Sequence, residues 1–268
     1  MNNLQSGQSL TNATWDDASE TVMSLKGQKG HLDEGVMQQI LSSYSPHERE
    51  MRRYGRPSIG SGLIFPVNEE KLMTDPIHLE DHWPRIAAID FGWDHPTAVV
   101  WCAIDRDEEM FYVYDCYRMS KASPTVHSQA IRSRPHFIPI AYPHDGNRRD
   151  SMGNPGLADQ YRNLGCNIML DHFTNPPALG ENKGGNSIEE GIMAMLQSME
   201  NGKFKVFSTL SDWFEEFRMY HRKGGKVVAI RDDIMSATRY AYQSQRFAVS
   251  GKDPAWTNEI KYKNYGII

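Results

Sequence analysis

The middle of the chain carries short apolar blocks of the kind that form buried strands. Three blocks rich in β-branched and aromatic residues cover residues 86–89 (IAAI), 97–104 (TAVVWCAI) and 110–117 (MFYVYDCY). The charged run at 105–109 predicts a hairpin turn between the second and the third, so the three blocks predict an antiparallel meander. Apolar runs at 137–142 and 167–170 predict two further strands, and 226–231 is also strand-like.

Helical spacing of apolar residues follows these strands along the chain. The predicted helices cover residues 123–134, 155–164, 187–199, 210–222 and 232–246, and a separate helix covers 31–43. The order is therefore three strands, then helices alternating with single strands, then further helices. This order predicts an α/β fold with a mixed five-strand central sheet, an antiparallel meander plus parallel strands, flanked by helices.

Composition narrows the class of protein. The 268 residues are 39% hydrophobic and 24% charged, which is ordinary for one large globular domain or one domain plus an appendage. No apolar run reaches the about 18 residues of a membrane span. Three cysteines without CxxC spacing argue against a disulfide framework or a zinc finger. The net charge of −5 argues against coating of nucleic acid through bulk charge, but not against an enzyme whose acidic metal ligands offset a basic groove.

The chain is expected to have three parts. Residues 1–80 are polar, are interrupted by glycine and proline, and offer no sheet core large enough to fold alone. Residues 81–249 hold the predicted strands and most of the predicted helices, and form the main domain. Residues 250–268 show no helical or strand period, so they are expected to be a C-terminal tail.

Aspartates stand at the ends of elements that can meet at one edge of the sheet. Asp90 ends the first strand, and Asp145 lies just past the predicted strand 137–142, before Gly146. Asp232 and Asp233 begin the last helix. Three or four carboxylates from separate elements suit a pair of divalent ions, which take oxygen ligands and stabilise the attacking and leaving oxygens of a phosphodiester displacement.

Each of these aspartates also has an ordinary structural interpretation. Asp232 or Asp233 suits a helix cap, and Asp145 suits a turn with Gly146. Asp90 is harder to explain in this way, because an acid directly after a buried apolar run is costly without a partner or a metal ion.

Basic residues cluster in sequence near the same acids. They are Arg148, Arg149, Arg222, Lys223, Lys226 and Arg231. The last four surround Gly224 and Gly225, so a hairpin there could grip phosphates without recognising bases. The alternative is a solvated helix end, where cations are common.

Three motifs, taken together, resemble those of one enzyme family. They are IDFGWDHPTAVVW (89–101), PHDG (143–146) and RDDIMSATRY (231–240). In this order they resemble the nuclease domain of the large terminase subunit of tailed double-stranded DNA phages and prophages, which implies an RNase H-like fold. Residues 11–18 and 31–67 are similar to the stretch that ends the ATPase domain in this family. That similarity implies that residues 1–80 are a remnant of that end and a linker.

The resemblance also implies a function and a site. The function is that of a metal-dependent endonuclease, a hydrolase that cuts concatemeric double-stranded DNA with little sequence specificity during packaging. Asp90, Asp145 and Asp232 would be the catalytic residues and would bind two Mg²⁺ or Mn²⁺ ions. Asp233 would be a further or alternative ligand. In this family the partners are double-stranded DNA, the small terminase subunit and the portal or procapsid, and the location is the host cytoplasm.

The sequence departs from the family pattern in several places. Arg231 stands where relatives often carry histidine, and Ser236 stands where they often carry a further aspartate. No GxxxxGK[ST] motif is present, so the chain is expected to carry no ATPase motor. The alternatives are another RNase H-like nuclease such as a resolvase or transposase, an actin-like sugar kinase, whose further Gly-rich phosphate loops are absent from the sequence, and a non-catalytic prophage remnant.

Overall fold

The computed structural model describes residues 33–42, 62–147, 155–177 and 184–251. The chain divides into a smaller unit, Met1–Asn68 with Arg218–Val228, and a larger unit, Glu69–Phe217 with Ala229–Ile268. The domain boundaries expected at residues 80 and 249 stay predictions, and residues 252–268 of the expected tail lie outside the described residues. Among the helices that the structure describes, none has the length and apolar character needed to cross a membrane.

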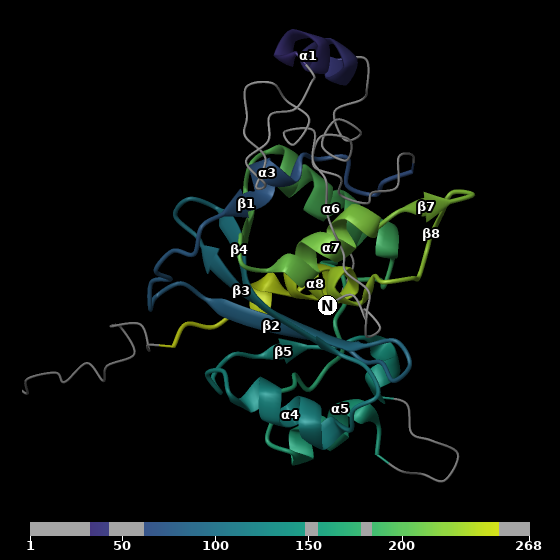
Figure 1. Ribbon diagram of the computed structural model, residues 1–268. Coiled ribbons are helices and arrows are strands. Elements are labelled where there is room, and N and C mark those ends of the chain that lie inside the picture. The colour runs from purple at the N-terminus through teal and green to yellow at the C-terminus, as the bar shows by residue number, and fades with distance from the viewer. Residues whose placement is uncertain (1–32, 43–61, 148–154, 178–183, 252–268) are drawn as a thin grey trace, which may run out of the picture. The chain divides into compact units, whose positions relative to one another are not determined.

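The larger unit is built on one mixed sheet (Figure 1). Its strands are β1 (Met73–Thr74), β2 (Arg85–Asp90), β3 (Thr97–Asp105), β4 (Met110–Met119), β5 (Ile140–Ala141) and β6 (Phe204–Phe207). They lie in the order β1-β6-β4-β3-β2-β5. Antiparallel pairing of β2 with β3 and of β3 with β4 confirms the predicted meander, and β5 and β6 add to it as parallel neighbours.

The sheet differs from the five-strand prediction at its edges. β6 and β1 were not expected, because strands of four and two residues are too short to show a period of two. Residues 167–170 contribute only an isolated bridge between Ile168 and Ile140. The run 137–142 forms strand only at Ile140–Ala141, and Pro139 within it has no N–H to donate to a ladder.

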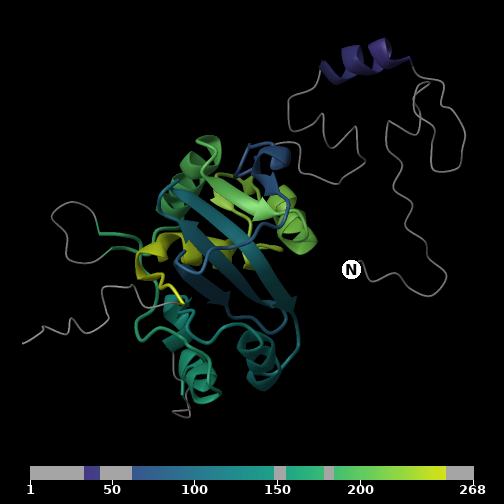
Figure 2. The same cartoon turned by 90° about the vertical axis from the view of Figure 1, so that its left-hand side faces the viewer.

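Helices cover both faces of this sheet (Figures 1 and 2). The bounds are α3 (Glu69–Leu72), α4 (Pro124–Arg132), α5 (Leu157–Asn163), α6 (Ile188–Glu200), α7 (Ser211–Met219) and α8 (Asp233–Gln243), with short 3₁₀ turns at η2 (His144–Asn147) and η3 (Gln245–Phe247). The helices predicted from residue 123 onward are confirmed within a few residues at each end. α4 and α5 lie on one face, whereas α8 packs on β2 and β3 from the other and contacts α6.

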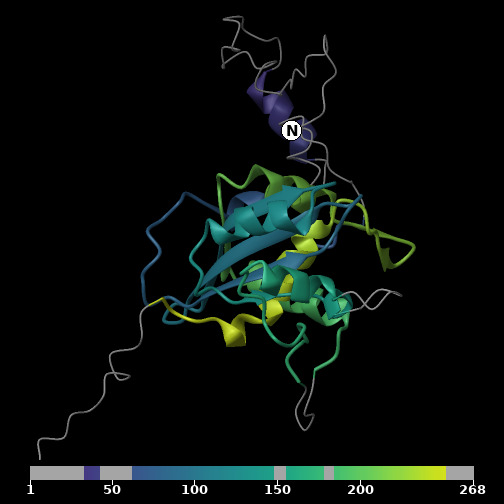
Figure 3. The same ribbon diagram turned by 90° about the horizontal axis from the view of Figure 1, so that it is seen from below.

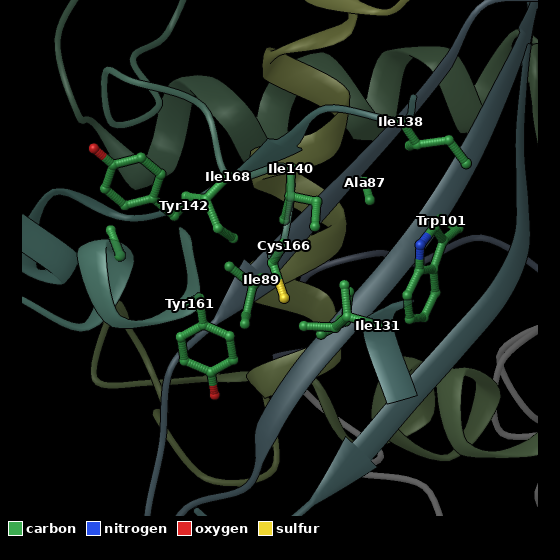
Figure 4. Packing of buried hydrophobic residues seen from close by; sticks show 12 residues of the cluster. Ala87, Ile89, Trp101, Ile131, Ile138, Ile140, Tyr142, Tyr161, Cys166 and Ile168 are labelled. Carbon is green, nitrogen blue, oxygen red and sulfur yellow. The ribbon is translucent and has the colours of Figure 1, made fainter. Parts of the chain in front are cut away.

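Strand alternation assigns the residues of β2 to the two faces. Ala87 and Ile89 join a buried cluster with side chains of β3, α4 and α5, on the side that Figure 3 views from below. Figure 4 shows Ile89 of this cluster beside Tyr161 and Ile131. Because successive side chains point to opposite faces, Asp90 belongs to the face that α8 covers.

The smaller unit contains two described pieces of regular structure. Helix α1 (Glu34–Ser42) falls within the predicted range 31–43, and the Asp33 carboxylate accepts hydrogen bonds from the first backbone N–H groups of this helix. β7 (Arg222–Lys223) and β8 (Lys226–Val227) form the hairpin expected around the two glycines. Gly224 and Gly225 have φ of 57° and 78°, the left-handed region that glycine adopts most easily.

Candidate functional site

Asp90 lies at the carboxyl end of β2, where the buried strand reaches the surface. Its Oδ1 accepts a hydrogen bond of 3.5 Å from the Tyr240 hydroxyl of α8. Burial, followed by the negative charges of Asp233, Asp232 and Asp145, raises the pKa of Asp90 well above its ordinary value. The structure therefore brings the aspartates singled out in the sequence close enough to repel one another.

Asp145 is held near Asp90 by tight packing of the residue that follows it. Asp145 is exposed and lies in η2, the next element after β5 along the chain. A Cβ on Gly146 would lie 2.6 Å from the ring of Phe91 and 2.8 Å from the ring of Tyr142, so only glycine fits there without displacement. Because Phe91 directly follows Asp90, this contact sets η2 against the end of β2.

Asp232 and Asp233 stand at the start of α8. Asp232 occupies the N-cap position, but its side chain makes no capping hydrogen bond. Asp233 is buried, and its Oδ2 has no hydrogen-bond partner. Burial and the charge of Asp233 raise the pKa of Asp232 to about 6, while His95 and Arg239 act in the opposite direction.

Glu216 provides the cap that Asp232 does not, and the sequence analysis missed it. This side chain is fully buried, and its Oε2 accepts hydrogen bonds from the backbone N–H groups of Ile234 at 2.6 Å and Met235 at 3.3 Å. Arg118 of β4 donates to Oε1 at 2.9 Å. A signal was available, because Glu216 falls at helical spacing from the apolar residues Trp213 and Tyr220 and so lies on the buried face of α7.

Two basic side chains also act on the aspartates. Arg239 is buried on α8, with its Nε and Nη1 atoms unpartnered, and its positive charge lowers the pKa of Asp90 and of Asp232. His95 is exposed on the loop between β2 and β3. Its charge lowers the pKa of Asp232 and Asp233, which places it on their side of the larger unit.

The donor chemistry of this site fits a hard divalent cation. Carboxylate oxygens are the ligands that Mg²⁺ and Mn²⁺ prefer, and the unpartnered Oδ2 of Asp233 is free to bind one. A cation would also relieve the repulsion that, after burial, raises the pKa of Asp90. Within the described ranges, no group of three or more acidic, histidine or cysteine side chains is arranged so that it could hold a metal ion. The structure thus shows a donor set and gives no coordination geometry.

The basic residues singled out in the sequence have different surroundings. Lys223 and Lys226 are exposed on the β7–β8 hairpin, and Arg222 Nη1 donates to the Gly225 carbonyl at 3.5 Å. Arg231 has a φ of 53° and donates to Glu215 of α7 at 2.8 Å, while its side chain stays 58% exposed. Arg148 and Arg149 lie outside the described residues.

Removing the charge of Asp232 is expected to stabilise the metal-free protein at high pH. Its folded-state pKa of about 6 exceeds the ordinary value of 3.8, so the free energy of unfolding falls as the pH rises through this window. In EDTA at pH 8, Asp232→Asn should gain about 1–2 kcal/mol, a value reduced for solvent screening of a half-buried group. At pH 4 the two proteins should unfold alike. Urea unfolding of the two proteins at pH 4 and at pH 8 measures this difference in the free energy of unfolding.

The control is Asp107→Asn, which neutralises an exposed aspartate in the turn between β3 and β4. Its free energy of unfolding should match that of the wild type at both pH values. A gain for Asp232→Asn that is equally large at pH 4 and pH 8 would contradict the assigned cause.

Comparison with known proteins finds relatives of one kind. The family described as "Terminase RNaseH-like domain" matches residues 87–245. The large terminase subunit of Salmonella phage P22 is 40% identical over 224 residues, which are 83% of this chain and 44% of that protein. The large terminase subunit of Enterobacteria phage LP7 is 40% identical over 213 residues, 79% of this chain and 44% of that protein. The chain therefore spans less than half the length of these relatives.

Solved structures show the same likeness. The structure of the P22 large terminase nuclease domain has a TM-score of 0.64 and 39% sequence identity, and the match covers 71% of this chain and 95% of that one. A large terminase from a thermophilic bacteriophage has a TM-score of 0.52 at 11% identity, with 81% of this chain and 53% of that one covered. The second likeness shows the fold alone.

Proposed function

This chain belongs to the terminase RNase H-like domain family, and on that premise we propose that it is a metal-dependent endonuclease that cuts double-stranded DNA. One observation carries the proposal. Asp90 at the end of β2 and the pair Asp232 and Asp233 at the start of α8 come from two separate elements of the larger unit. Burial, followed by the charges of Asp233, Asp232 and Asp145, raises the pKa of Asp90. Mutual repulsion of this kind has no structural benefit, so it points to a cation as the missing partner.

We assign the metal-binding roles to Asp90, Asp145 and the pair at the start of α8. Asp232 is the first choice of that pair, and the buried, unpartnered Oδ2 of Asp233 supports a role for it as well. Two Mg²⁺ or Mn²⁺ ions, when bound, would stabilise the attacking and leaving oxygens of a phosphodiester hydrolysis.

The chain's own residues prepare this site. The Tyr240 hydroxyl donates a long hydrogen bond of 3.5 Å to one oxygen of Asp90, which favours one orientation of the carboxylate. Arg239 offsets part of the negative charge from within the core, so the acids remain ionised to a greater extent than their burial alone would allow. No contact to a base edge is needed for this chemistry, which suits cleavage with little sequence preference.

We propose that the biological setting is phage DNA packaging, because the relatives that match are large terminase subunits. The substrate would be concatemeric double-stranded DNA. The partners would be the small terminase subunit and the portal or procapsid, and the location would be the host cytoplasm.

Plasmid cleavage tests the proposed function. The purified chain should nick and linearise supercoiled plasmid with Mn²⁺ or Mg²⁺, should stop in excess EDTA, and should recover when Mn²⁺ is added back. Activity that persists in excess EDTA would contradict the metal dependence. Selective cleavage of a branched junction would favour a resolvase, and hydrolysis of ATP would favour the kinase class.

The lysines of the β7–β8 hairpin are expected to bind DNA phosphates. The double variant Lys223→Gln with Lys226→Gln should bind duplex DNA more weakly in Ca²⁺, a condition chosen so that the DNA is bound but not cut. The slope of the logarithm of the binding constant against the logarithm of the salt concentration should fall by up to about 2. Fluorescence anisotropy over a series of salt concentrations measures both effects. The matched control neutralises two exposed cations elsewhere, through Lys71→Gln and Arg106→Gln. Equal losses in the two double variants would show that only total charge matters.

A further inference from the structure

An aspartate at the N-cap position normally accepts a hydrogen bond from its own helix. Such a cap satisfies one of the first backbone N–H groups, which otherwise lack partners. Asp232 holds this position on α8, yet its side chain caps nothing. The first N–H groups of α8 are satisfied instead by Glu216, which comes from α7 and lies 18 residues from Ile234 in sequence.

The Glu216 carboxylate is itself fixed from the other side. Arg118 of β4 donates to its second oxygen at 2.9 Å, and the Glu216 side chain has no exposed surface. Arg118 also contacts Asp212 at 3.5 Å and Glu215 at 3.2 Å, so it is held by three acids of α7. The chain of contacts therefore runs from the sheet through α7 to the first turn of α8, and it uses both oxygens of Glu216.

We propose that Glu216 is a positioning residue that caps α8 in place of Asp232, and thereby leaves the carboxylates of Asp232 and Asp233 available to a divalent cation. This inference rests on the proposed function. It explains why the aspartate at the N-cap position of α8 makes no capping hydrogen bond. It also explains why a fully buried glutamate stands on the apolar face of α7. Arg118 supports Glu216, and neither of them is proposed as a ligand of the cation.

Thermal unfolding in EDTA tests the capping step without any cleavage. In the wild-type background, Asp232→Ala should leave the melting temperature unchanged or raise it, because no cap is lost. In the Glu216→Met background, Asp232 is free to take over the cap. There the same substitution should lower the melting temperature by several degrees. If Asp232→Ala changes the melting temperature equally in the two backgrounds, the proposal that Glu216 caps α8 in place of Asp232 is overturned.

Binding of Mn²⁺ in the absence of DNA tests the consequence for the site. The loss of the free Mn²⁺ signal in electron paramagnetic resonance gives the affinity. Glu216→Met should weaken it by about 10–100-fold, the range found when a group that orients a metal ligand is removed. Glu216→Gln keeps an oxygen that can accept both N–H bonds, so its affinity should stay within about threefold of the wild type.

The conservative variant separates positioning from charge. If Glu216 acts only through its negative charge, Glu216→Gln will lose as much affinity as Glu216→Met, and the proposal is overturned. Asp212→Asn removes another acid from Arg118 without touching α8, and should bind Mn²⁺ as the wild type does. If Glu216→Met fails to fold, Arg118→Met with Glu216→Met replaces it, because this pair also removes the half-buried guanidinium that loses Glu216 as a partner.

The outcomes also separate this inference from the proposed function. Wild-type Mn²⁺ affinity in Glu216→Met would overturn the positioning role while the nuclease proposal stands. A wild-type chain that neither binds Mn²⁺ nor cleaves DNA would refute the proposed function. In that case the melting temperatures of Asp232→Ala in the two backgrounds still decide whether Glu216 caps α8. The proposed role of Glu216 in cation binding would be refuted together with the proposed function.

Discussion

Asp90→Asn is expected to abolish metal-dependent DNA cleavage and to make the metal-free protein more stable. The rate should fall by at least about 10³-fold, since the loss of one carboxylate from the ion-binding set costs several kcal/mol of transition-state stabilisation. Asparagine fills the same volume without the charge that burial disfavours and that Asp233, Asp232 and Asp145 repel, so the melting temperature in EDTA should rise. Plasmid nicking with Mn²⁺ and thermal unfolding in EDTA measure the two effects.

Two variants control this result. Asp90→Glu keeps the charge but displaces the oxygens, so it should lose cleavage without gaining stability. Asp107→Asn removes an exposed charge in the turn between β3 and β4 and should leave both properties as in the wild type. Wild-type turnover in Asp90→Asn would remove Asp90 from the site.

Trp213→Ala is expected to be among the most destabilising single substitutions in the larger unit. Trp213 of α7 is fully buried, and its indole donates to Thr238 Oγ1 of α8 at 3.0 Å. Its ring stacks on Phe217 at 5.2 Å between centroids and contacts Phe204 of β6 at 6.2 Å. Truncation leaves a cavity among three elements and should cost about 3–5 kcal/mol in the free energy of unfolding. Urea unfolding followed by circular dichroism gives this value.

Trp213→Phe separates packing from the hydrogen bond. Phenylalanine keeps part of the aromatic contact, and Thr238 keeps its own bond of 2.7 Å to the Ile234 carbonyl. The loss should therefore be clearly smaller than for alanine. Equal losses in the two variants would mean that the hydrogen bond to α8, and not the packing, carries the stability.

The fold was predictable from the sequence where its signals are local. Residues 97–104 and 110–117 are apolar and β-branched enough to indicate strands, and the charged turn between them gives their antiparallel pairing. The family resemblance drawn from the motifs is confirmed by the match at residues 87–245. β6 could not be predicted in this way, because its pairing with β4 joins residues far apart in the sequence and its four residues carry no period.

The site was predictable only as a set of separate positions. Asp90 after an apolar run and Asp232 at a helix start are visible in the sequence, and the structure brings them within electrostatic reach. The bonds of Glu216 to α8 could not be seen, because they depend on how α7 packs against α8. Arg239 was missed for the same reason, since an arginine on a helix is expected at the surface until tertiary packing buries it.

The contact of Gly146 with Phe91 and Tyr142 constrains how relatives of this chain can diverge. These two rings and the bare Cα of Gly146 fill one space between the segments that carry Asp90 and Asp145. A larger residue at 146 must be matched by a smaller ring at 91 or 142, or the two segments move apart. The three positions should therefore covary in side-chain volume among homologues, and their shared volume acts as a spacer that keeps the carboxylates a constant distance apart.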